Sequence, residues 1–509
     1  MLGFRLLCSL KHLNGFRIDN RGIGACYSSF ATQNTAQCTS QARHSSVSYG
    51  QPTNATHPHL VKPGELLPGL KLEEFRERRE KLAARILADE YVTKNPENSH
   101  IVIIPSSNIV YMSDKIPYIF RQNTDFLYFT GCQEPESILV LFLHRQDCSS
   151  RLFVRRKDQY SELWDGPRTG VDAVVQMFDV DEGLPVGDFE KYLVSYLMEN
   201  KKSSIWYDNT SILQLELHKK LMNVLQLTNS QTFVSPKRAF HEIRLIKSKA
   251  EIDLMRKSCE VASAAIAKTI EVSKPGMSEH QLFATVDYEC RMNGAELLGY
   301  PPVVAGGANA NVIHYIKNNQ IVQNGEMILM DAGCEYHGYT SDITRTWPVN
   351  GTFTPQQRVL YEIVLDVQKT LIPQLTEFPN LDQVFHDMCV LLGQRLQEIG
   401  LIPSNLSGEK LRAAAYTYCP HHVSHYLGMD VHDTGMISRA TSIKPGMVVT
   451  MEPGIYVSPR NQMAPPEFHG LGIRIEDDVL IQENGPVVLT ASCPKEISDI
   501  EELAKKNQS

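Results

Sequence analysis

Acidic residues end several short apolar runs in the C-terminal half of this 509-residue chain. The run Met-Ile-Leu-Met leads into Asp331, Met-Val-Val-Thr-Met leads into Glu452, and Ile-Arg-Ile leads into Glu476. A carboxylate that is buried without a partner is energetically costly. The chain can therefore fold around these strands only if cations or arginine side chains neutralise the acids together. A salt bridge to Arg474 is the simplest alternative for Glu476 taken by itself.

The segment from Gly325 to Trp347 predicts a strand, a turn at Gly338 and a second strand. A hairpin of this length can place Asp331 and Asp342 side by side on one face. Two carboxylates at such range repel each other unless a cation neutralises them. The alternative is a pair of exposed acids, but Asp331 ends a strongly apolar strand and should be buried.

Histidines are concentrated in the next part of the chain. Four of them lie within 12 residues: His421, His422, His425 and His432. A single histidine is more often a satisfied core residue, whereas a cluster of this density indicates a functional site.

Four carboxylates and one imidazole are enough for two divalent ions about 3.5 Å apart if carboxylates bridge them. Such oxygen-rich ligation favours Mn²⁺, with Co²⁺ or Zn²⁺ as substitutes. The HExxH spacing of zinc proteases is absent from the sequence. These residues predict a hydrolase with two metal ions.

A short internal repeat surrounds two of the acids. Gly325 lies six residues before Asp331, and Gly446 lies six residues before Glu452; each acid follows a methionine and precedes a glycine by two positions. The repeat predicts two similar α/β halves that face each other and supply ligands from equivalent strands.

The N-terminal half has a different pattern. Apolar residues recur there at helical spacing among many charges: Leu72, Phe75, Leu82 and Ile86. Residues 101–105 and 138–143 are short apolar runs that predict strands, so this part should be a smaller α/β domain. Ser248 and Glu251 form a capping-box pattern at the start of a long helix, which Pro275-Gly276 should end. We place the domain boundary near residue 245, giving domains over 63–245 and 246–509.

The first 60 residues contain one acid, Asp19, against five basic residues, and are rich in serine and threonine. This composition is typical of a mitochondrial transit peptide, and the Leu6-Leu7 core is short for a secretory signal. The alternative is a tail without an addressing role. We expect residues 1–62 to comprise a transit peptide and a disordered linker. A matrix location follows, with a cytosolic pool where the segment is absent.

Composition excludes several other classes. The formal net charge of −8 and the lack of a basic cluster argue against a nucleic-acid partner. The sequence has no run of 18 apolar residues that would predict a membrane span. The 11 cysteines are irregularly spaced, which favours free thiols, and Cys334 is expected to be a packing residue.

The chain resembles the pita-bread metallopeptidases, in particular the aminopeptidase P group and its mitochondrial branch. The motifs that carry this resemblance are Asp331-Ala-Gly, Ser341-Asp342-Ile-Thr-Arg, His421-x-x-Ser-His425, Val431-His432-Asp433, Met451-Glu452-Pro-Gly and Ile473-Arg-Ile-Glu476-Asp. It covers residues 65–495 and includes Phe120–Gly131, which is similar to the N-terminal domain of that family.

The resemblance implies a C-terminal pita-bread fold and a pair of Mn²⁺ ions. The implied ligands are Asp331, Asp342, His425, Glu452 and Glu476, of which Asp342 and Glu476 would bridge the ions. Residues at the substrate and supporting positions of the family are Tyr300, His314, His421, His432 and Arg474. It also implies a homodimer formed through the first domain.

The implied activity is removal of the N-terminal residue from peptides with proline in second position, by a hydroxide that bridges the ions. Glu452 would be the general base, and His432 or His314 would stabilise the oxyanion. His421 would lie beside the leaving proline nitrogen. Protein N-termini exposed by presequence removal are candidate substrates.

Other functions share the fold. A prolidase, which cleaves only Xaa-Pro dipeptides, has the same ligands. A methionine aminopeptidase leaves the first domain unexplained, and a creatinase-like enzyme usually lacks the full ligand set. A non-catalytic binding scaffold would have no reason to keep five buried metal-binding groups.

Overall fold

The computed structural model describes residues 48–505 except 95–96, 146 and 229–232. Most of the expected transit peptide therefore lies outside the described residues. The last part of the expected linker, residues 48–62, is not disordered but forms successive turns. Gln51 and Val61 are buried there, and the Gln51 side-chain amide donates to the carbonyl of Gly131 at 3.0 Å. These contacts hold the segment against the folded domain, although its polar composition had suggested disorder.

A five-stranded mixed sheet forms the centre of the N-terminal part, in the order β8-β7-β6-β3-β9. The strands are β3 (Ser99–Pro105), β6 (Ile138–His144), β7 (Asp147–Val154), β8 (Glu182–Pro185) and β9 (Ser203–Trp206). β3, β6 and β7 pair antiparallel, whereas β8 and β9 join the edges in parallel. The two predicted strands are confirmed as β3 and β6.

Helices cover both faces of this sheet because its residues alternate between two cores. Ile101 and Ile103 pack with α6 (Phe189–Glu199) and α7 (Leu215–Thr228), whereas Val102 and Ile104 pack with α1 (Leu72–Leu87), α3 (Thr124–Thr130) and α5 (Val171–Phe178). The helix predicted from its apolar spacing is α1, and its Phe75, Leu82 and Ile86 have no exposed surface. The predicted α/β architecture is confirmed.

The shorter elements of this part lie around the sheet. They are β1 (Glu65–Leu67), β2 (Leu70–Lys71), α2 (Glu90–Thr93), β4 (Tyr111–Ser113), β5 (Ile116–Pro117), α4 (Gln159–Asp165) and α8 (Lys237–Arg244).

The long helix α9 (Lys249–Val272) begins at the predicted capping box. The Ser248 hydroxyl accepts from the backbone N–H of Glu251, and the Glu251 carboxylate accepts from the N–H of Ser248. This satisfies two of the donors that a helix start leaves unpaired. The helix ends three residues before Pro275, as predicted.

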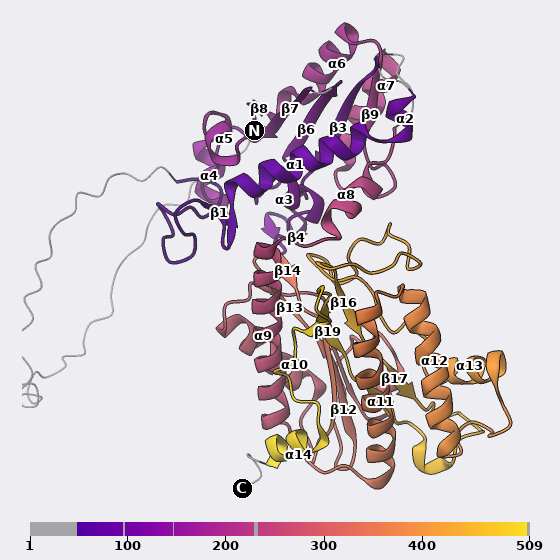
Figure 1. Ribbon diagram of the computed structural model, residues 1–509. Coiled ribbons are helices and arrows are strands. Elements are labelled where there is room, and N and C mark those ends of the chain that lie inside the picture. Colours follow the sequence, from indigo (N-terminus) through magenta and orange to yellow (C-terminus); the bar gives the residue numbers. More distant parts are fainter. Residues whose placement is uncertain (1–47, 95–96, 146, 229–232, 506–509) are drawn as a thin grey trace, which may run out of the picture. The chain divides into compact units, whose positions relative to one another are not determined.

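Two similar halves build the C-terminal part. The first contains α9, α10 (Glu279–Met292) and the sheet β11-β12-β15, formed by Val303–Gly306, Met327–Ala332 and Ile343–Pro348. The second contains α11 (Pro355–Gln374), α12 (Leu381–Glu398) and the sheet β16-β19-β20, formed by Val448–Met451, Asp477–Leu480 and Val487–Val488. Figure 1 shows strands of both halves between the two helix pairs, and one hydrophobic core runs through both.

Equivalent strands confirm the internal repeat. β12 and β16 each start two residues after a glycine with positive φ, +88° at Gly325 and +89° at Gly446. β12 contains Asp331 near its end, and Glu452 follows β16 directly.

Shorter elements and the last helix complete the C-terminal part. They are β10 (Leu297–Leu298), β13 (Cys334–Tyr336), β14 (Tyr339–Thr340), α13 (Gly408–Tyr416), β17 (Gly454–Tyr456), β18 (Gly472–Arg474) and α14 (Ile497–Lys505). Among the described residues, helices of the length and apolarity needed to cross a bilayer are absent. The described cysteines are free thiols, and Cys334 is buried in the core as expected.

Candidate metal centre

The first two predicted ligands lie side by side, as the hairpin pattern predicted. β12 pairs antiparallel with β15, and Asp331 faces Thr344 across the pair, two residues beyond Asp342. The chain reverses through His337 and Gly338, whose φ angles of +51° and +85° match the tight turns that connect β-hairpins. The Tyr300 hydroxyl lies 2.7 Å from Asp331 Oδ1 and 2.5 Å from Asp342 Oδ1, so one phenol joins both acids.

Gly333 allows the two strands to cross at this point. A Cβ atom at this position would lie 1.7 Å from the carbonyl oxygen of Ser341, a backbone atom that cannot move away alone. The glycine of the Asp331-Ala-Gly motif is therefore required by the close approach that brings Asp342 to Asp331.

His425 lies among the acids. Its Nε2 is 3.4 Å from Asp342 Oδ2 and 3.5 Å from Glu452 Oε1. Its Nδ1 lies 3.1 Å from the carbonyl oxygen of Tyr426, which assigns the proton to Nδ1 and leaves the lone pair of Nε2 able to bind a cation. Asp342, His425 and Glu476 each offer a ligand atom, and these atoms lie within 4.8 Å of one another.

Arg474 pairs with Asp331 rather than with Glu476. Its Nη2 donates to Asp331 Oδ2 at 2.7 Å and its Nε donates to Thr344 Oγ1 at 3.0 Å. Thr344 Oγ1 in turn donates to Glu476 Oε2 at 2.6 Å. The structure therefore does not contain the simple salt bridge between Arg474 and Glu476 that was the alternative for this acid.

The electrostatics of the cluster favour cation binding. Four carboxylates, two of them buried (Asp342 and Glu476) and two about 15% exposed (Asp331 and Glu452), face one guanidinium, so a single arginine cannot neutralise them all. Burial raises the pKa of Glu452 to about 7, and burial also raises the pKa values of Asp331 and Glu476. Burial alone would lower the pKa of His425, but contacts with Asp342 and Glu452 outweigh it and raise that pKa to about 9. Protons thus compete for a site whose donors, four carboxylates and an imidazole, fit divalent cations.

Two further histidines lie close to these acids. His421 Nε2 is 3.0 Å from the hydroxyl of Tyr456, and burial lowers the pKa of His421 to about 4, so its imidazole is neutral. The ring of His432 is 4.5 Å from the ring of His425, at an interplanar angle of 77°. His432 is exposed, as is His314. Desolvation of the imidazole is the main cause that lowers the pKa values of His421 and of His432, whose ring is partly shielded although the residue as a whole is exposed, and the charge of His314 adds to it at both.

Comparisons with known proteins agree with this geometry. Residues 253–483 match the metallopeptidase family M24, and residues 75–206 match the aminopeptidase P N-terminal domain. The chain is 42% identical to Xaa-Pro aminopeptidase 3 of Rattus norvegicus over 497 residues, 96% of each protein. The chain belongs to the aminopeptidase P family.

Other relatives extend the comparison. Intermediate cleaving peptidase 55, mitochondrial, of Arabidopsis thaliana is 40% identical, over 89% of this chain and 87% of that protein. Aminopeptidase P from Escherichia coli, solved with the inhibitor Pro-Leu, has a TM-score of 0.77 and 32% identity, over 86% of this chain and 98% of the other. The same enzyme has been solved zinc-substituted with product. The predicted pita-bread fold is confirmed, and the chain is a hydrolase of this metallopeptidase family.

Sequence reasoning missed several residues that support the family's ligand positions. Thr344, Thr450 and Asp478 each lie two residues from a predicted ligand and therefore share its strand face. The Thr450 hydroxyl accepts from the N–H of His425 at 3.1 Å, and Asp478 Oδ2 accepts from the N–H of Asp342 at 2.9 Å. The alternation of side chains along a strand, with a period of two residues, was the sequence signal that could have identified these three residues.

Tyr456 was missed as well, and the sequence contains no comparable signal for it. Its hydroxyl accepts from Arg474 Nη1 at 2.7 Å and can then donate to Nε2 of His421. This connects Asp331 through Arg474 and Tyr456 to His421 within the aminopeptidase P site.

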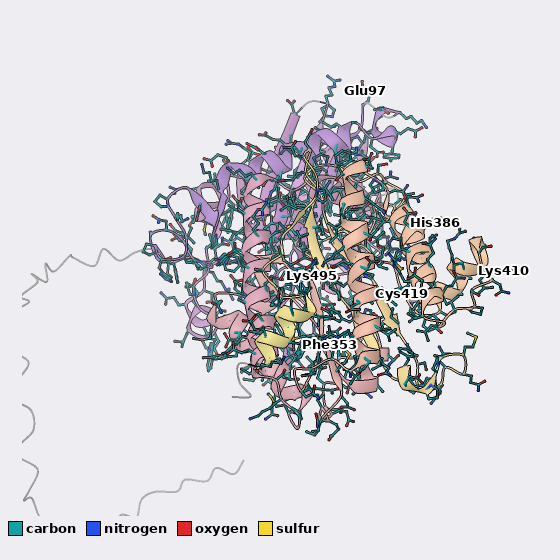
Figure 2. All side chains as sticks on the ribbon, turned by 60° about the horizontal axis from the view of Figure 1, so that its bottom comes forward. Glu97, Phe353, His386, Lys410, Cys419 and Lys495 are labelled. Atoms are coloured by element: carbon teal, nitrogen blue, oxygen red, sulfur yellow. The ribbon has the colours of Figure 1, made fainter. Side chains whose placement is uncertain are left out.

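A buried ion pair fixes the strands behind the ligands. Arg345 Nη2 donates to Asp477 Oδ1 at 2.7 Å, and neither side chain is exposed. Lys495, labelled in Figure 2, also pairs with Asp477 and donates to Gln368 Oε1 of α11 at 2.9 Å. Because Asp477 follows Glu476, this pair restricts the backbone from which that acid extends.

Proposed function

We propose that the chain is a two-metal Xaa-Pro aminopeptidase, which releases the N-terminal residue from peptides with proline in second position. The convergence of Asp342, His425 and Glu476, with Asp331 and Glu452 beside them, carries this proposal. Relatives named Xaa-Pro aminopeptidase and a bacterial relative solved with Pro-Leu support the choice of substrate.

Five residues would hold the metal pair: Asp331, Asp342, His425, Glu452 and Glu476. By the family resemblance, Asp342 and Glu476 would be the ligands shared by both ions, and the oxygen-rich set favours Mn²⁺, with Co²⁺ or Zn²⁺ as substitutes. When bound, two divalent ions acidify a water molecule and polarise the scissile carbonyl.

The side chains around that centre divide the remaining tasks. Glu452 accepts the proton of the attacking water as general base. His432 or His314 donates a hydrogen bond to the developing oxyanion. His421, held neutral, lies beside the leaving proline nitrogen.

Two other residues hold the acids in place. Tyr300 and Arg474 orient Asp331, near which the substrate amine binds. This restricts cleavage to the N-terminus. Proline needs a dedicated enzyme because its ring removes the N–H and restricts φ.

Peptide length and the second residue test this function. We expect the Mn²⁺-loaded protein to release the first residue from Xaa-Pro-Xaa tripeptides. Its kcat/KM should exceed that for Xaa-Ala-Xaa by more than about tenfold, because differential transition-state binding of even one additional methylene group is worth about tenfold or more. The measurement is product analysis by mass spectrometry over a series of substrate concentrations. Cleavage of Xaa-Pro dipeptides alone would instead identify a prolidase, and metal binding without cleavage of any peptide would identify a binding scaffold.

We propose a mitochondrial location for the chain, on the composition of residues 1–62 and on the relative whose name includes that compartment. Residues 63–245 and 246–509 would be the domains that remain after import. Protein N-termini freshly exposed by presequence removal are then the candidate substrates. Fusion of residues 1–62 to a fluorescent protein tests whether this segment directs import into mitochondria. The N-terminal proteome of knock-out mitochondria tests the substrates, and an unchanged proteome would contradict the substrate proposal.

We also propose a homodimer formed through the N-terminal part. Large apolar side chains are exposed on β4, β5 and α4 and in the residues beside them: Val110, Tyr111, Met112, Ile116, Tyr118, Ile119, Tyr160, Leu163 and Trp164. Four of them, Tyr111, Tyr118, Tyr160 and Trp164, line one pocket. α4 has no buried residue although it carries three of them. Exposed patches of this kind mark protein interfaces. Sedimentation measurements on the full chain should give a dimer, and a monomer at all concentrations would exclude it.

A further inference from the structure

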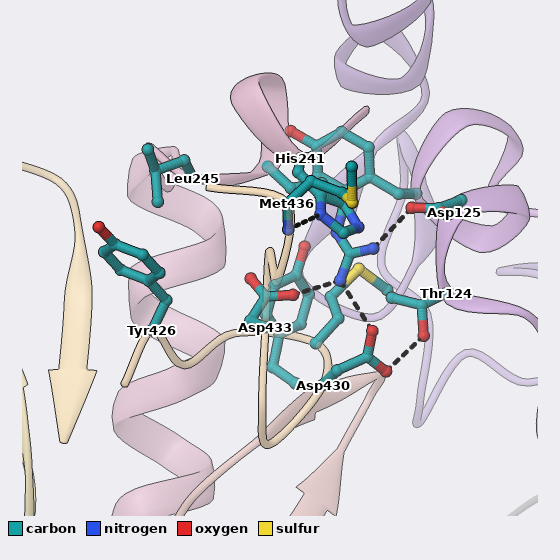
Figure 3. A network of polar contacts seen from close by, with 12 residues as sticks. Thr124, Asp125, His241, Leu245, Tyr426, Asp430, Asp433 and Met436 are labelled. Atoms are coloured by element: carbon teal, nitrogen blue, oxygen red, sulfur yellow. Dashed lines mark hydrogen bonds and ion pairs between the residues drawn. The ribbon is translucent and has the colours of Figure 1, made fainter. Parts of the chain in front are cut away.

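One arginine outside the metal centre joins the N-terminal part to the loop that carries His432. Arg244 ends α8, and its side chain is only 3% exposed. Its Nη1 donates to Asp125 Oδ1 of α3 at 2.6 Å, and its Nη2 donates to Asp430 Oδ2 at 2.9 Å and also to Asp433 (Figure 3). Asp125 belongs to the N-terminal part, whereas Asp430 and Asp433 flank His432 in the sequence.

The acids around Arg244 are matched by cations. Lys237 Nζ lies 2.7 Å from Asp125 Oδ2, and Lys247 Nζ lies 3.2 Å from Asp433 Oδ2. Burial would raise the pKa of Asp430, but Arg244 and Arg121 outweigh it and lower that pKa to about 2. Each of the three acids thus has at least one cationic side chain within ion-pair distance, so the cluster needs no metal ion. Removing one partner from such a buried set leaves an uncompensated charge, which is strongly destabilising locally.

These contacts fix the loop at several points. The N–H of Asp433 donates to the carbonyl of Tyr426 at 2.9 Å, and the N–H of Met436 donates to His241 Nδ1 of α8 at 3.0 Å (Figure 3). Between them, Thr434 has a φ of +49°, a left-handed conformation that persists only where surrounding contacts impose it.

We propose that Arg244 is a positioning residue for peptide hydrolysis, which sets the place of the His432 imidazole by holding the loop of residues 429–436 against α3 and α8. The inference rests on the proposed function, because His432 is a substrate-binding residue only there. The ring of His432 lies 4.5 Å from that of the proposed ligand His425. A small displacement of the loop would therefore move the His432 imidazole away from the substrate carbonyl that it is proposed to contact.

A double-mutant cycle with a structural readout tests the proposal. The variants are Arg244→Met, Arg244→Lys, His432→Ala and Arg244→Met with His432→Ala. Arg79→Met is the matched control, because Arg79 is a buried arginine that donates to the backbone carbonyls of Phe129 and Phe178 within the N-terminal part. The readouts are kcat/KM with an Xaa-Pro tripeptide and hydrogen–deuterium exchange of residues 429–436.

We expect Arg244→Met to lower kcat/KM by about 100-fold, because misplacement of a positioned group by about 1 Å has effects of that size. The loss should nearly vanish in the His432→Ala background, and exchange of residues 429–436 should rise. Arg244→Lys, which keeps the charge but not the three contacts, should recover only part of the activity. Arg79→Met should lower thermal stability and change neither readout.

Two results would overturn the inference: unchanged exchange of residues 429–436 in Arg244→Met, or an equal loss of kcat/KM with and without His432. If Arg244→Met does not fold, Asp430→Asn enters the same cycle, since the Asp430 side chain is 36% exposed and its replacement is milder. Failure of the proposed function is distinct, because the wild-type protein would then not cleave the tripeptide, while the exchange measurement would still decide whether Arg244 holds the loop.

Discussion

Replacement of Glu452 by glutamine should abolish peptide hydrolysis while the protein keeps its fold. The change preserves the shape of the side chain and removes the basic carboxylate oxygen. Loss of a general base lowers kcat by roughly 1,000-fold. Glu452 Oε1 lies 3.5 Å from Nε2 of His425, so in the proposed centre the carboxylate would be within reach of a cation bound by His425. The measurement is kcat with an Xaa-Pro tripeptide, together with metal content and thermal denaturation.

Glu251→Gln is the matched control for this prediction. Glu251 is also a buried glutamate, but it caps α9 and accepts from the Tyr339 hydroxyl at 3.0 Å, away from the metal ligands. Glutamine can still cap the helix, so kcat should not change. Substantial turnover by a metal-loaded Glu452→Gln protein would refute the assignment of Glu452 as the base.

Removal of metal ions should have an effect of similar size. A chelator should abolish activity and lower the melting temperature, and Mn²⁺ should restore both best among Mn²⁺, Co²⁺ and Zn²⁺. The physical reason is that four closely spaced acids, all largely shielded from solvent, face one guanidinium until cations bind. Ligand at 100 times its Kd stabilises the native state by about 2.7 kcal/mol, so the shift should be easy to measure by calorimetry.

Metal analysis and one variant complete this test. Plasma mass spectrometry should find two ions per chain, and Asp342→Asn should lose the Mn²⁺-dependent rise in melting temperature. Arg79→Met should keep that rise from a lower starting temperature, because the hydrogen bonds of Arg79 go to the backbone carbonyls of Phe129, Phe178 and Asp179 in the N-terminal part. Full activity in protein shown to be metal-free would contradict the two-metal proposal.

Local patterns in the sequence predicted much of the framework. The apolar runs became β3, β6, β12 and β16, and the Ser248–Glu251 pattern became the capping box of α9. The hairpin that pairs Asp331 with the residues after Asp342 was predictable because strand register follows from a period of two and from turn geometry. Such features depend on residues that are close in the sequence.

Other features depended on which distant elements meet. Arg474 pairs with Asp331 and not with the adjacent Glu476, because the strand that carries it lies beside β15. Residues 48–62 look disordered by composition, yet Gln51 bonds to Gly131 across 80 residues. Neither contact leaves a signal in the neighbouring sequence. For residues 48–62 the composition therefore led us to expect disorder, whereas the structure shows an ordered segment.

By itself, the sequence indicated which residues are candidate ligands and which strands present them, because a buried acid at the end of an apolar strand has few physical explanations. Only the tertiary structure decided the partners of each acid and the anchoring of the His432 loop by Arg244. These contacts join residues that are far apart in the sequence, between Asp125 and Glu476. The directions of their side chains are set by the packing of helices and sheets and not by spacing along the chain.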